Sequence, residues 1–433
     1  MEKNVGFFEK VFRLKDHGTN VKTEVLAGLT TFMTMAYILI VNPLTLSAAG
    51  LDMGKVFTAT AVSSLVATLV MGLLANLPFA LAPGMGLNAF FAYTVVLGMG
   101  KSPEFALTAV FLEGLIFILL SFFNVREAII NSIPHNLKKA ISVGIGLFIA
   151  FIGLVNAGIV VQGGAILSLG DITSGTALLA LIGLVIAGIL LAYNVKGALF
   201  IAIILTTIIG YPMGITSFPG QIISKPAAPY FFDFAWSDIL SLDMFVVLFT
   251  FLFVDIFDTV GTLVGVSTKA GLINEKGEVP KAKQALLADA IGTTFGAILG
   301  TSTVTTYVES ASGVSEGGRT GLTAVTTALF FGIALLFSPL FIMIPGAATA
   351  PVLILVGLFM MSPVTEINFH DFTEAIPAFL TIIMMPLSYS ISDGIVFGVI
   401  SYVALKLASK KFKDVSIVTF ILAVLFILKF IFL

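Results

Sequence analysis

The chain has 433 residues, of which 58% are hydrophobic and 11% are charged. A soluble protein of this length could not keep so much apolar surface out of water, and many runs approach or exceed the roughly 18 apolar residues typical of a membrane helix. The net charge of −2 gives no indication of a nucleic-acid partner, and the absence of cysteine excludes disulfides and thiolate chemistry. The sequence therefore predicts a multi-pass membrane protein.

The chain begins with a charged, amphipathic segment, residues 1–23, for which we expect an interfacial helix on the cytoplasmic side. Fourteen apolar spans follow, of which the third and the tenth are short and interrupted by glycine or polar residues. A last apolar run, 415–433, could either cross the membrane again or lie along its surface. The expected spans are 24–48, 56–77, 86–100, 104–123, 138–158, 174–193, 197–217, 243–268, 281–299, 305–315, 320–343, 348–362, 372–388 and 392–409.

Basic residues test the orientation of these spans, because cytoplasmic loops of membrane proteins are enriched in lysine and arginine. With the N-terminus in the cytoplasm, eighteen of the 22 basic residues fall on the cytoplasmic side. On the other side are only Lys55, Lys101 and Lys225, while Lys429 lies in the last run. A miscount by one span would exchange the sides of all later loops and remove this excess of basic residues on the cytoplasmic side. We therefore expect both the number of spans and their orientation to be correct.

The two halves of the chain resemble each other faintly. The segment IPHNLKKAISVGIGLF begins at Ile133 and IPGAATAPVLILVGLF begins at Ile344, with Gly-Leu-Phe at the same spacing after Ile-Pro. DIT at 171 recurs as DFT at 371 in the same order. Because each half holds seven spans, the second half must enter the membrane from the opposite side. The pattern favours an inverted repeat, although apolar sequences also resemble one another by chance.

An inverted repeat predicts a site near the midplane, at a pair of interrupted spans. The third span is preceded by LPFALAPGMGLNAFFAY (77–93), in which Pro83 and Gly86 break helix. Its counterpart is LGTSTVTTYVESASGVSEGG (299–318), in which 301–306 favour extended backbone. Two short extended segments can pair at the bilayer centre and satisfy each other's backbone groups. The half-helices after them would direct their N–H groups to the same place.

Acidic residues gather where these segments should converge. Asp255 and Asp258 are three positions apart in the eighth span and share one helix face. Glu309 stands at the start of the tenth half-helix, and Asn88 opens the third. Carboxylates accept two adjacent N–H groups of a planar heterocycle and can also carry a proton. The pattern predicts a buried polar site for a substrate with N–H donors, and for a proton.

Each polar residue also has a structural interpretation. Asp258 fits a hydrogen bond to a neighbouring helix equally well, and Asn88 fits a helix N-cap. Glu113 in the fourth span and Asp289 in the ninth fit a structural role better. Glu24 lies at a span end, where solvation is cheap.

Other classes of protein are less compatible with the sequence. The three histidines, His17, His135 and His370, fall outside the predicted spans, so neither metal ligands nor a nucleophile–base pair indicate an enzyme. A channel would need rings of charge around a symmetric pore. The near absence of lysine and arginine from the spans argues weakly against an anionic substrate.

Four motifs resemble one known family. They are GLTTFMTMAYILIVNP (28–43), APGMGLNAFFAY (82–93), FVDIFDTVGTL (253–263) and TSTVTTYVESASG (301–313). Their order and combination resemble the adenine/guanine/hypoxanthine permeases. These form the AzgA-like branch of the nucleobase–cation symporter family, which also includes the uracil and xanthine permeases. The resemblance runs through nearly the whole chain.

The resemblance implies an all-α polytopic fold of fourteen spans in a seven-plus-seven inverted repeat, with extended segments at spans 3 and 10. A core domain of spans 1–4 and 8–11 would carry the substrate, and a gate domain of spans 5–7 and 12–14 would mediate dimerisation. The corresponding ranges are 1–23 for the N-terminus, 24–123 and 243–343 for the core, 124–242 and 344–410 for the gate, and 411–433 for the C-terminal segment.

The implied activity is proton-coupled uptake of hypoxanthine, guanine or adenine across the cell (inner) membrane, by elevator-like movement of core against gate. No cofactor is implied, and sodium stays open as the coupling ion. Uracil, xanthine or an inorganic anion are the alternative substrates, although the eighth-span histidine of the uracil-type sequences is missing. The resemblance places the family's eighth-span acid at Asp255, its tenth-span polar residue at Glu309, its third-span Gly-x-Asn at Gly86 and Asn88, and a further polar residue at Thr259. Our candidate residues for substrate binding are Asp255, Glu309, Asn88, Gly86, Val308 and Thr259, and those for proton coupling are Asp255, Asp258 and Glu309.

Overall fold

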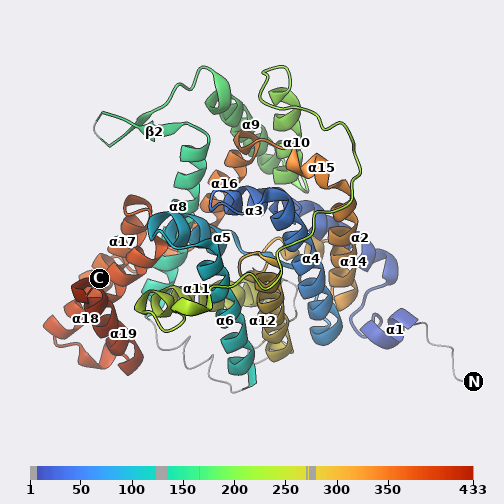
Figure 1. Cartoon of the computed structure of the whole chain (residues 1–433). Helices are drawn as coiled ribbons and strands as arrows, with labels where there is room; N and C mark the ends of the chain where they lie inside the picture. Colours follow the sequence, from blue (N-terminus) through green and yellow to red (C-terminus); the bar gives the residue numbers. More distant parts are fainter. Residues whose placement is uncertain (1–6, 123–133, 165, 270–271, 273–278, 433) are drawn as a thin grey trace, which may run out of the picture.

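A computed structural model of the chain describes residues 7–122, 134–164, 166–269, 272 and 279–432 (Figure 1). Residues 1–6 of the expected N-terminal helix, the expected domain boundary at 123–124 and Leu433 lie outside this part. Almost all of the described residues in regular structure are helical, as the long apolar runs predicted.

The first half of the chain contains most of the expected spans at nearly the expected positions. The exception is the first span, which is broken at Ala36 and Tyr37 into two helices. Its elements are α1 (Phe7–Phe12), α2 (Val21–Met35), α3 (Ile38–Ser47), α4 (Met53–Val70), η1 (Met71–Ala75), β1 (Leu81–Pro83), α5 (Met85–Ala89), η2 (Phe90–Gly98), α6 (Pro103–Phe122), α8 (His135–Asn156), β2 (Val160–Gln162), β3 (Leu167–Leu169), α9 (Gly175–Ala192) and α10 (Ala198–Gly210).

The second half of the chain follows a long connection with little helix. It consists of η3 (Trp236–Asp238), α11 (Leu242–Lys269), α12 (Ala282–Leu299), β4 (Val304–Thr306), α13 (Ser310–Ser315), α14 (Gly321–Ala334), η4 (Leu335–Phe337), α15 (Ser338–Ile342), α16 (Gly346–Met360), η5 (Ser362–Glu366), α17 (Phe372–Leu387), α18 (Ile391–Ala408), η6 (Phe412–Asp414) and α19 (Ile417–Phe432).

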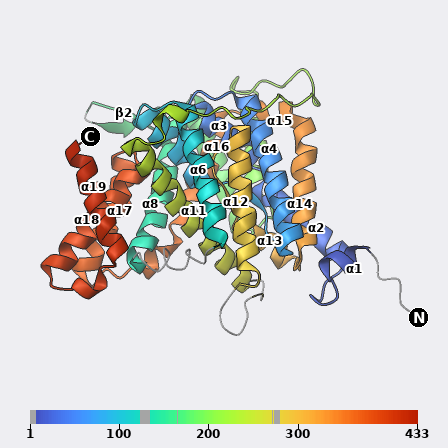
Figure 2. The same ribbon diagram turned by 60° about the horizontal axis from the view of Figure 1, so that its bottom comes forward.

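The helices form one bundle of membrane-spanning dimensions. Among the described residues, eight helical segments are long and apolar enough to cross a membrane, and four shorter apolar helices accompany them. Figure 2 shows many of the helices standing side by side, with α1 at one end of the bundle and β2 at the other. The protein is therefore a mostly helical, multi-pass membrane protein.

The two short strands expected at the interrupted spans pair with each other. β1 and β4 are antiparallel, with Leu81 opposite Thr306 and Pro83 opposite Val304. The backbone N–H groups of Gly84 and Tyr307 extend the ladder, each 2.9 Å from a carbonyl oxygen of the other segment. Both strands are fully buried. Because no lipid or water is needed to satisfy these backbone groups, extended chain is tolerated here at membrane depth.

A second pair of strands was not expected. β2 and β3 form a short antiparallel hairpin after α8, with Val160 opposite Leu169, and most of its residues are exposed. Three-residue strands are too short to show the alternation of apolar and polar residues by which a strand is recognised in a sequence. The hairpin lies at the periphery of the molecule (Figure 1).

The helices pack in two sets. In one, α12 packs against α4 and α6, and α14 against α2 and α4. In the other, α8 packs against α16 and α17, α9 against α10 and α16, and α17 against α18. The last apolar run forms α19, which packs against α18. Its Phe426 also meets Phe249 of α11, with ring centroids 6.0 Å apart.

Candidate functional site

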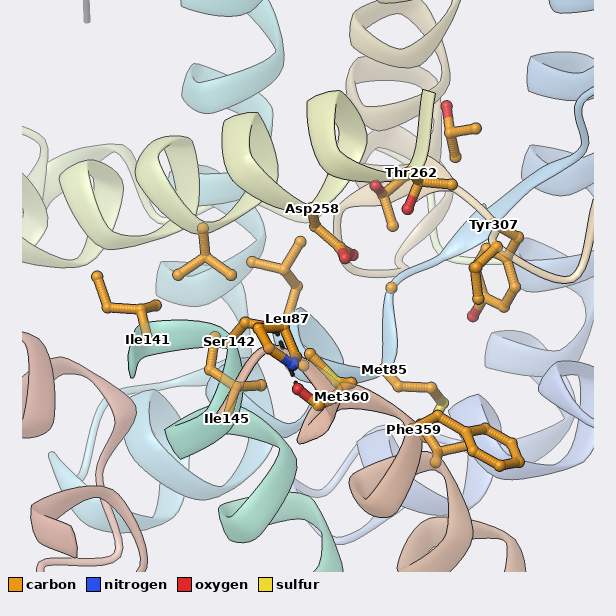
Figure 3. A pocket seen from close by; sticks show the side chains of 18 of the residues that line it. Met85, Leu87, Ile141, Ser142, Ile145, Asp258, Thr262, Tyr307, Phe359 and Met360 are labelled. Atoms are coloured by element: carbon orange, nitrogen blue, oxygen red, sulfur yellow. Dashed lines mark hydrogen bonds between the residues drawn. The ribbon is translucent and has the colours of Figure 1, made fainter. Parts of the chain in front are cut away.

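A cavity of about 490 Å³ lies beside the paired strands, between the two sets of helices. One wall comes from α5, α11 and the segment around β4, and the opposite wall from α8, α16 and η5. Figure 3 shows Asp258 of α11 directed into this space toward Leu87 and Met85, with Ile145 of α8 nearby. The volume is in the range of small-molecule sites, which are mostly apolar with a few placed polar groups.

Two carboxylates line the cavity, and one of them is held by a tyrosine. Asp258 and Glu309 are both partly buried. The hydroxyl of Tyr37 donates a hydrogen bond of 2.6 Å to Oε1 of Glu309. Tyr37 is buried and comes from the break between α2 and α3. This bond fixes one oxygen of Glu309, while the other remains a potential acceptor for a ligand.

A second tyrosine closes the cavity near the strands. Tyr307, directly after β4, lines the cavity and donates its hydroxyl to the carbonyl oxygen of Pro83 at 2.5 Å. Pro83 ends β1, so this bond ties the two extended segments together outside their ladder. Thr305 and Thr306 of β4 also line the cavity. The strand pair thus holds the residues around the cavity in place and also forms part of the cavity wall.

The segment 301–306 is anchored by side chains from surrounding helices, one residue after another. Nδ2 of Asn42, on α3, donates to the hydroxyl of Thr301 at 2.8 Å. The hydroxyl of Ser302 donates to Oδ1 of Asn88, on α5. All four side chains are completely buried. Because buried polar groups need partners, these bonds constrain the path of the segment.

The next two residues are anchored in the same way. The hydroxyl of Thr303 donates to Oε2 of Glu113, on α6, at 2.6 Å. The backbone N–H and carbonyl of Val304 bond to the hydroxyl of Thr293, on α12, at 3.2 and 2.9 Å. Thr293 thereby acts as a partner on the side of β4 that does not pair with β1.

The last two residues of the segment reach a cluster of acids. The hydroxyls of Thr305 and Thr259 are 2.7 Å apart. Thr259 also lies 3.4 Å from Oδ1 of Asp255 and 3.0 Å from Oδ1 of Asp289. The hydroxyl of Thr306 donates weakly to the same oxygen of Asp289, at 3.4 Å. A continuous polar network therefore joins the cavity wall to acids on α11 and α12.

The structure separates the predicted site residues into two groups. Four line the cavity: Asp258, Glu309, Gly86 and Val308. Three do not line it and belong to the polar network around 301–306: Asp255, Asn88 and Thr259.

Gly86 is required by packing. A Cβ atom at this position would stand 2.8 Å from Cγ2 of Ile145, on α8. α5 therefore approaches α8 so closely that a side chain at position 86 would force Ile145 to shift. The cavity lies along this close contact, so the glycine serves the packing and the shape of the site together.

Several cavity residues were missed by the sequence reasoning. They carried no clear signal, since tyrosine, methionine and threonine are common in apolar spans as core residues. A polar tyrosine in the middle of the first span was the one available hint for Tyr37. The missed residues include Tyr37, Tyr307, Thr262, Met85 and Leu87.

One end of the cavity carries positive charge. Lys138 and Lys139, near the start of α8, line it together with Ser362 and Pro363 of η5. Nζ of Lys139 lies 3.1 Å from Oε2 of Glu366, which ends η5. The lysines mark the end of the bundle toward which the cavity extends.

Comparison with known proteins identifies the class of this molecule. The Permease family matches residues 22–397, well over half of the chain. The chain belongs to the Permease family. The permease is therefore a transporter and not an enzyme, and the family resemblance carried by the four motifs is confirmed.

Named relatives match this permease along nearly its whole length. It is 45% identical to the adenine permease AdeP of Escherichia coli strain K12, over 99% of this chain and 96% of the relative. It is 48% identical to the guanine/hypoxanthine permease PbuG of Bacillus subtilis strain 168, over 98% of this chain and 99% of the relative.

Among solved structures, the transmembrane domain of the cyanobacterium bicarbonate transporter BicA has a similar fold. The TM-score is 0.67 at 15% identity, covering 88% of this chain and 97% of that domain. At this identity the likeness concerns the fold alone.

Proposed function

We propose that this permease takes up purine nucleobases, with hypoxanthine, guanine and adenine as its substrates, together with a proton. The observation that carries the proposal is the cavity in which the carboxylates of Asp258 and Glu309 face an otherwise mostly apolar lining. The relatives named adenine permease and guanine/hypoxanthine permease support the substrate class.

The chemistry of a purine fits these walls. A purine is flat and offers N–H groups at its edge, which carboxylate oxygens accept strongly. Apolar side chains such as Leu87, Val254 and Phe359 can cover its faces. Glu309 is placed to bind, because Tyr37 holds one of its oxygens. Asp258, whose carboxylate also lines the cavity, is suited to bind the substrate, the proton, or both in sequence.

In this proposal Asp255 and Thr259 do not contact the substrate and act through residues that line the cavity. Thr259 touches Thr305, which lines the cavity, and Asp255 lies 3.4 Å from Thr259. Asn88 holds Ser302 in the same segment. These residues set the position of β4, and Asp255 takes part in proton coupling through the network rather than through direct contact in this conformation.

We further propose the fourteen-span inverted repeat, with 24–123 and 243–343 as the core and 124–242 and 344–410 as the gate. The two sets of packed helices support this division, and the cavity lies between them. Movement of the core against the gate would carry the substrate across the membrane. A homodimer through the gate and a location in the cell membrane complete the proposal.

The orientation follows from the basic residues. If the N-terminus is cytoplasmic, the end of the bundle that carries Lys138 and Lys139 is cytoplasmic as well, because positive charge is retained on that side. The cavity extends toward this end. The structure then corresponds to an inward-facing state.

The deciding experiment is uptake of radiolabelled hypoxanthine into cells that lack their own purine carriers. The proposal expects saturable uptake that a protonophore abolishes and that unlabelled guanine or adenine inhibits. Xanthine, uracil and sulfate serve as competitors for the alternative substrates. Absence of uptake by a protein present in the membrane would overturn the substrate assignment, and uptake that follows sodium would overturn proton coupling.

A further inference from the structure

One buried carboxyl group takes no part in the cavity. Glu113, on α6, is 0% exposed, and its Oε2 accepts the hydrogen bond from Thr303. Its Oε1 is also buried and has no hydrogen-bond partner among the residues that the structure describes. A buried, ionised carboxylate with one oxygen unpartnered is costly, because neither water nor a donor replaces its hydration.

The neighbours of Glu113 do not compensate for a negative charge. α6 packs against α12, α11, η2 and η3. On α12, Asp289 is a second completely buried carboxyl group, whose charge would have the same sign as that of Glu113. The titratable residues of the other three elements are Asp243, Asp255, Asp258 and Lys269 on α11, Tyr93 on η2 and Asp238 on η3. The one base among them, Lys269, ends α11, far along the helix from Ile256, the residue that packs with Phe117 one turn from Glu113.

Glu113 is nevertheless connected to the cavity. The backbone carbonyl of Thr303 accepts a hydrogen bond of 2.9 Å from the N–H of Gly84, and Gly84 lines the cavity. Two residues further along, Thr305 lines it as well. A shift of this segment when substrate binds would therefore move Thr303, which donates to Glu113.

We propose that Glu113 is a proton-binding site of the transport cycle, separate from the carboxylates of the cavity. It binds the proton on Oε1 while Thr303 donates to Oε2, and it releases that proton to water when the segment 301–306 moves. No bond other than the O–H bond is made or broken. The inference rests on the proposed function, because it assigns a role within coupled purine uptake.

The test uses the full-length permease in liposomes with an imposed gradient of about one pH unit, across which one coupled proton contributes about tenfold to accumulation. We expect E113Q to accumulate about tenfold less labelled hypoxanthine than the wild type. Exchange of labelled for unlabelled hypoxanthine without a gradient should continue. E104Q, on the same helix but not wholly buried, is the matched control and should accumulate normally.

Other outcomes decide against the proposal. Normal, pH-driven accumulation by E113Q would show that Glu113 exchanges no proton. If E113Q lost exchange too, E113D would decide, because it keeps an acid. Recovery of accumulation in E113D supports the proposal, and loss of exchange in both variants despite retained hypoxanthine binding assigns Glu113 a structural role. If a sodium gradient alone drives hypoxanthine accumulation by the wild type, the proposal that Glu113 binds a coupled proton is wrong.

A failure of the purine assignment is recognised separately, since the wild type would then neither bind nor exchange hypoxanthine. In that case infrared difference spectra of the wild type between neutral and alkaline pH test the proton site directly. A carboxylic-acid band that titrates and is absent from E113Q supports the site, and its absence from the wild type overturns it.

Discussion

Tyr37 and Glu309 illustrate how single residues build this site. They are 272 positions apart in the chain, yet one hydroxyl and one carboxylate meet at 2.6 Å on the cavity wall. Glu309 could be singled out from the sequence, because an acid in an apolar stretch is expensive unless it has a task. Tyr37 could not, because a buried tyrosine in an apolar span is equally compatible with ordinary packing.

Removing the Tyr37 hydroxyl should weaken substrate binding. In Tyr37→Phe, Glu309 loses a charge-assisted hydrogen bond and becomes free to rotate. Such bonds contribute about 2 kcal/mol, which corresponds to about thirtyfold in Kd. The Kd of hypoxanthine for the purified permease measures this. Tyr211→Phe, at an exposed position, is the control. An unchanged Kd in Tyr37→Phe would show that Glu309 does not bind substrate.

At the scale of elements, side-chain contacts at helix termini connect the helices in a way that the predicted spans did not show. Glu24 was expected at a solvated span end, and this expectation is wrong, because Glu24 is 0% exposed. Its carboxylate accepts hydrogen bonds from the backbone N–H groups of Arg319, Thr320 and Thr323, and from the hydroxyl of Thr323. The N–H groups just before α14 and in its first turn thus attract a carboxylate from α2, which becomes buried there.

Truncating Glu24 should destabilise the bundle. Glu24→Ala removes the acceptor of the backbone N–H groups of Arg319 and Thr320 and one of the two acceptors of the N–H of Thr323, and the expected loss in free energy of unfolding is about 3 kcal/mol. The melting temperature of the purified protein in detergent should fall accordingly. Asp16→Ala, at an exposed position before α2, should leave it unchanged. A melting temperature equal to that of the wild type would mean that other groups satisfy these donors.

The start of α17 should respond to acid. Asp371 is its N-cap, and the hydrogen bonds from Lys411 and Thr373 hold the pKa of this carboxyl well below its usual range. Because the pKa is lowered in the folded state, the contact stabilises above the unfolded value of about 4 and is lost as the pH falls below it.

Hydrogen exchange of the first turn of α17 measures this effect. Protection should decrease on acidification in the wild type. Asp371→Asn should be less protected at neutral pH and should show little further change. An identical pH dependence in both proteins would assign the effect to another group.

At the scale of the whole molecule, the position of the cavity between two sets of helices carries the transport hypothesis. The chain contains no cysteine, so single cysteines can report access without a background. Ser142, on α8, lines the cavity, and Ser168, in the exposed hairpin, lies at the opposite end of the bundle.

A cysteine in place of Ser142 should react with a membrane-impermeant thiol reagent from the cytoplasmic side only. Bound hypoxanthine should slow the reaction, because it fills the same cavity. S168C should react from the other side and be indifferent to hypoxanthine. Reaction of S142C from outside alone would reverse the proposed orientation.

The sequence by itself determined the class of the protein, the positions of most helices and the two extended segments that pair as β1 and β4. The length of apolar runs, the glycine and proline breaks, and the β-branched runs are local properties of the sequence. They predict structure directly because the thickness of the bilayer sets the length of a helix, and because every backbone group within the bilayer needs a partner. Acids within apolar stretches are also a local feature of the sequence, and this feature identified Asp255, Asp258 and Glu309 as candidate site residues.

Only the tertiary structure decided which acids face the cavity. Asp255 and Asp258 lie on one helix three positions apart, yet Asp258 lines the cavity and Asp255 joins the network of Thr259. The burial of Glu24 and the half-satisfied carboxyl of Glu113 depend on partners from elements distant in the chain. Such contacts arise from the packing of helices, and the pattern of any single helix does not contain them.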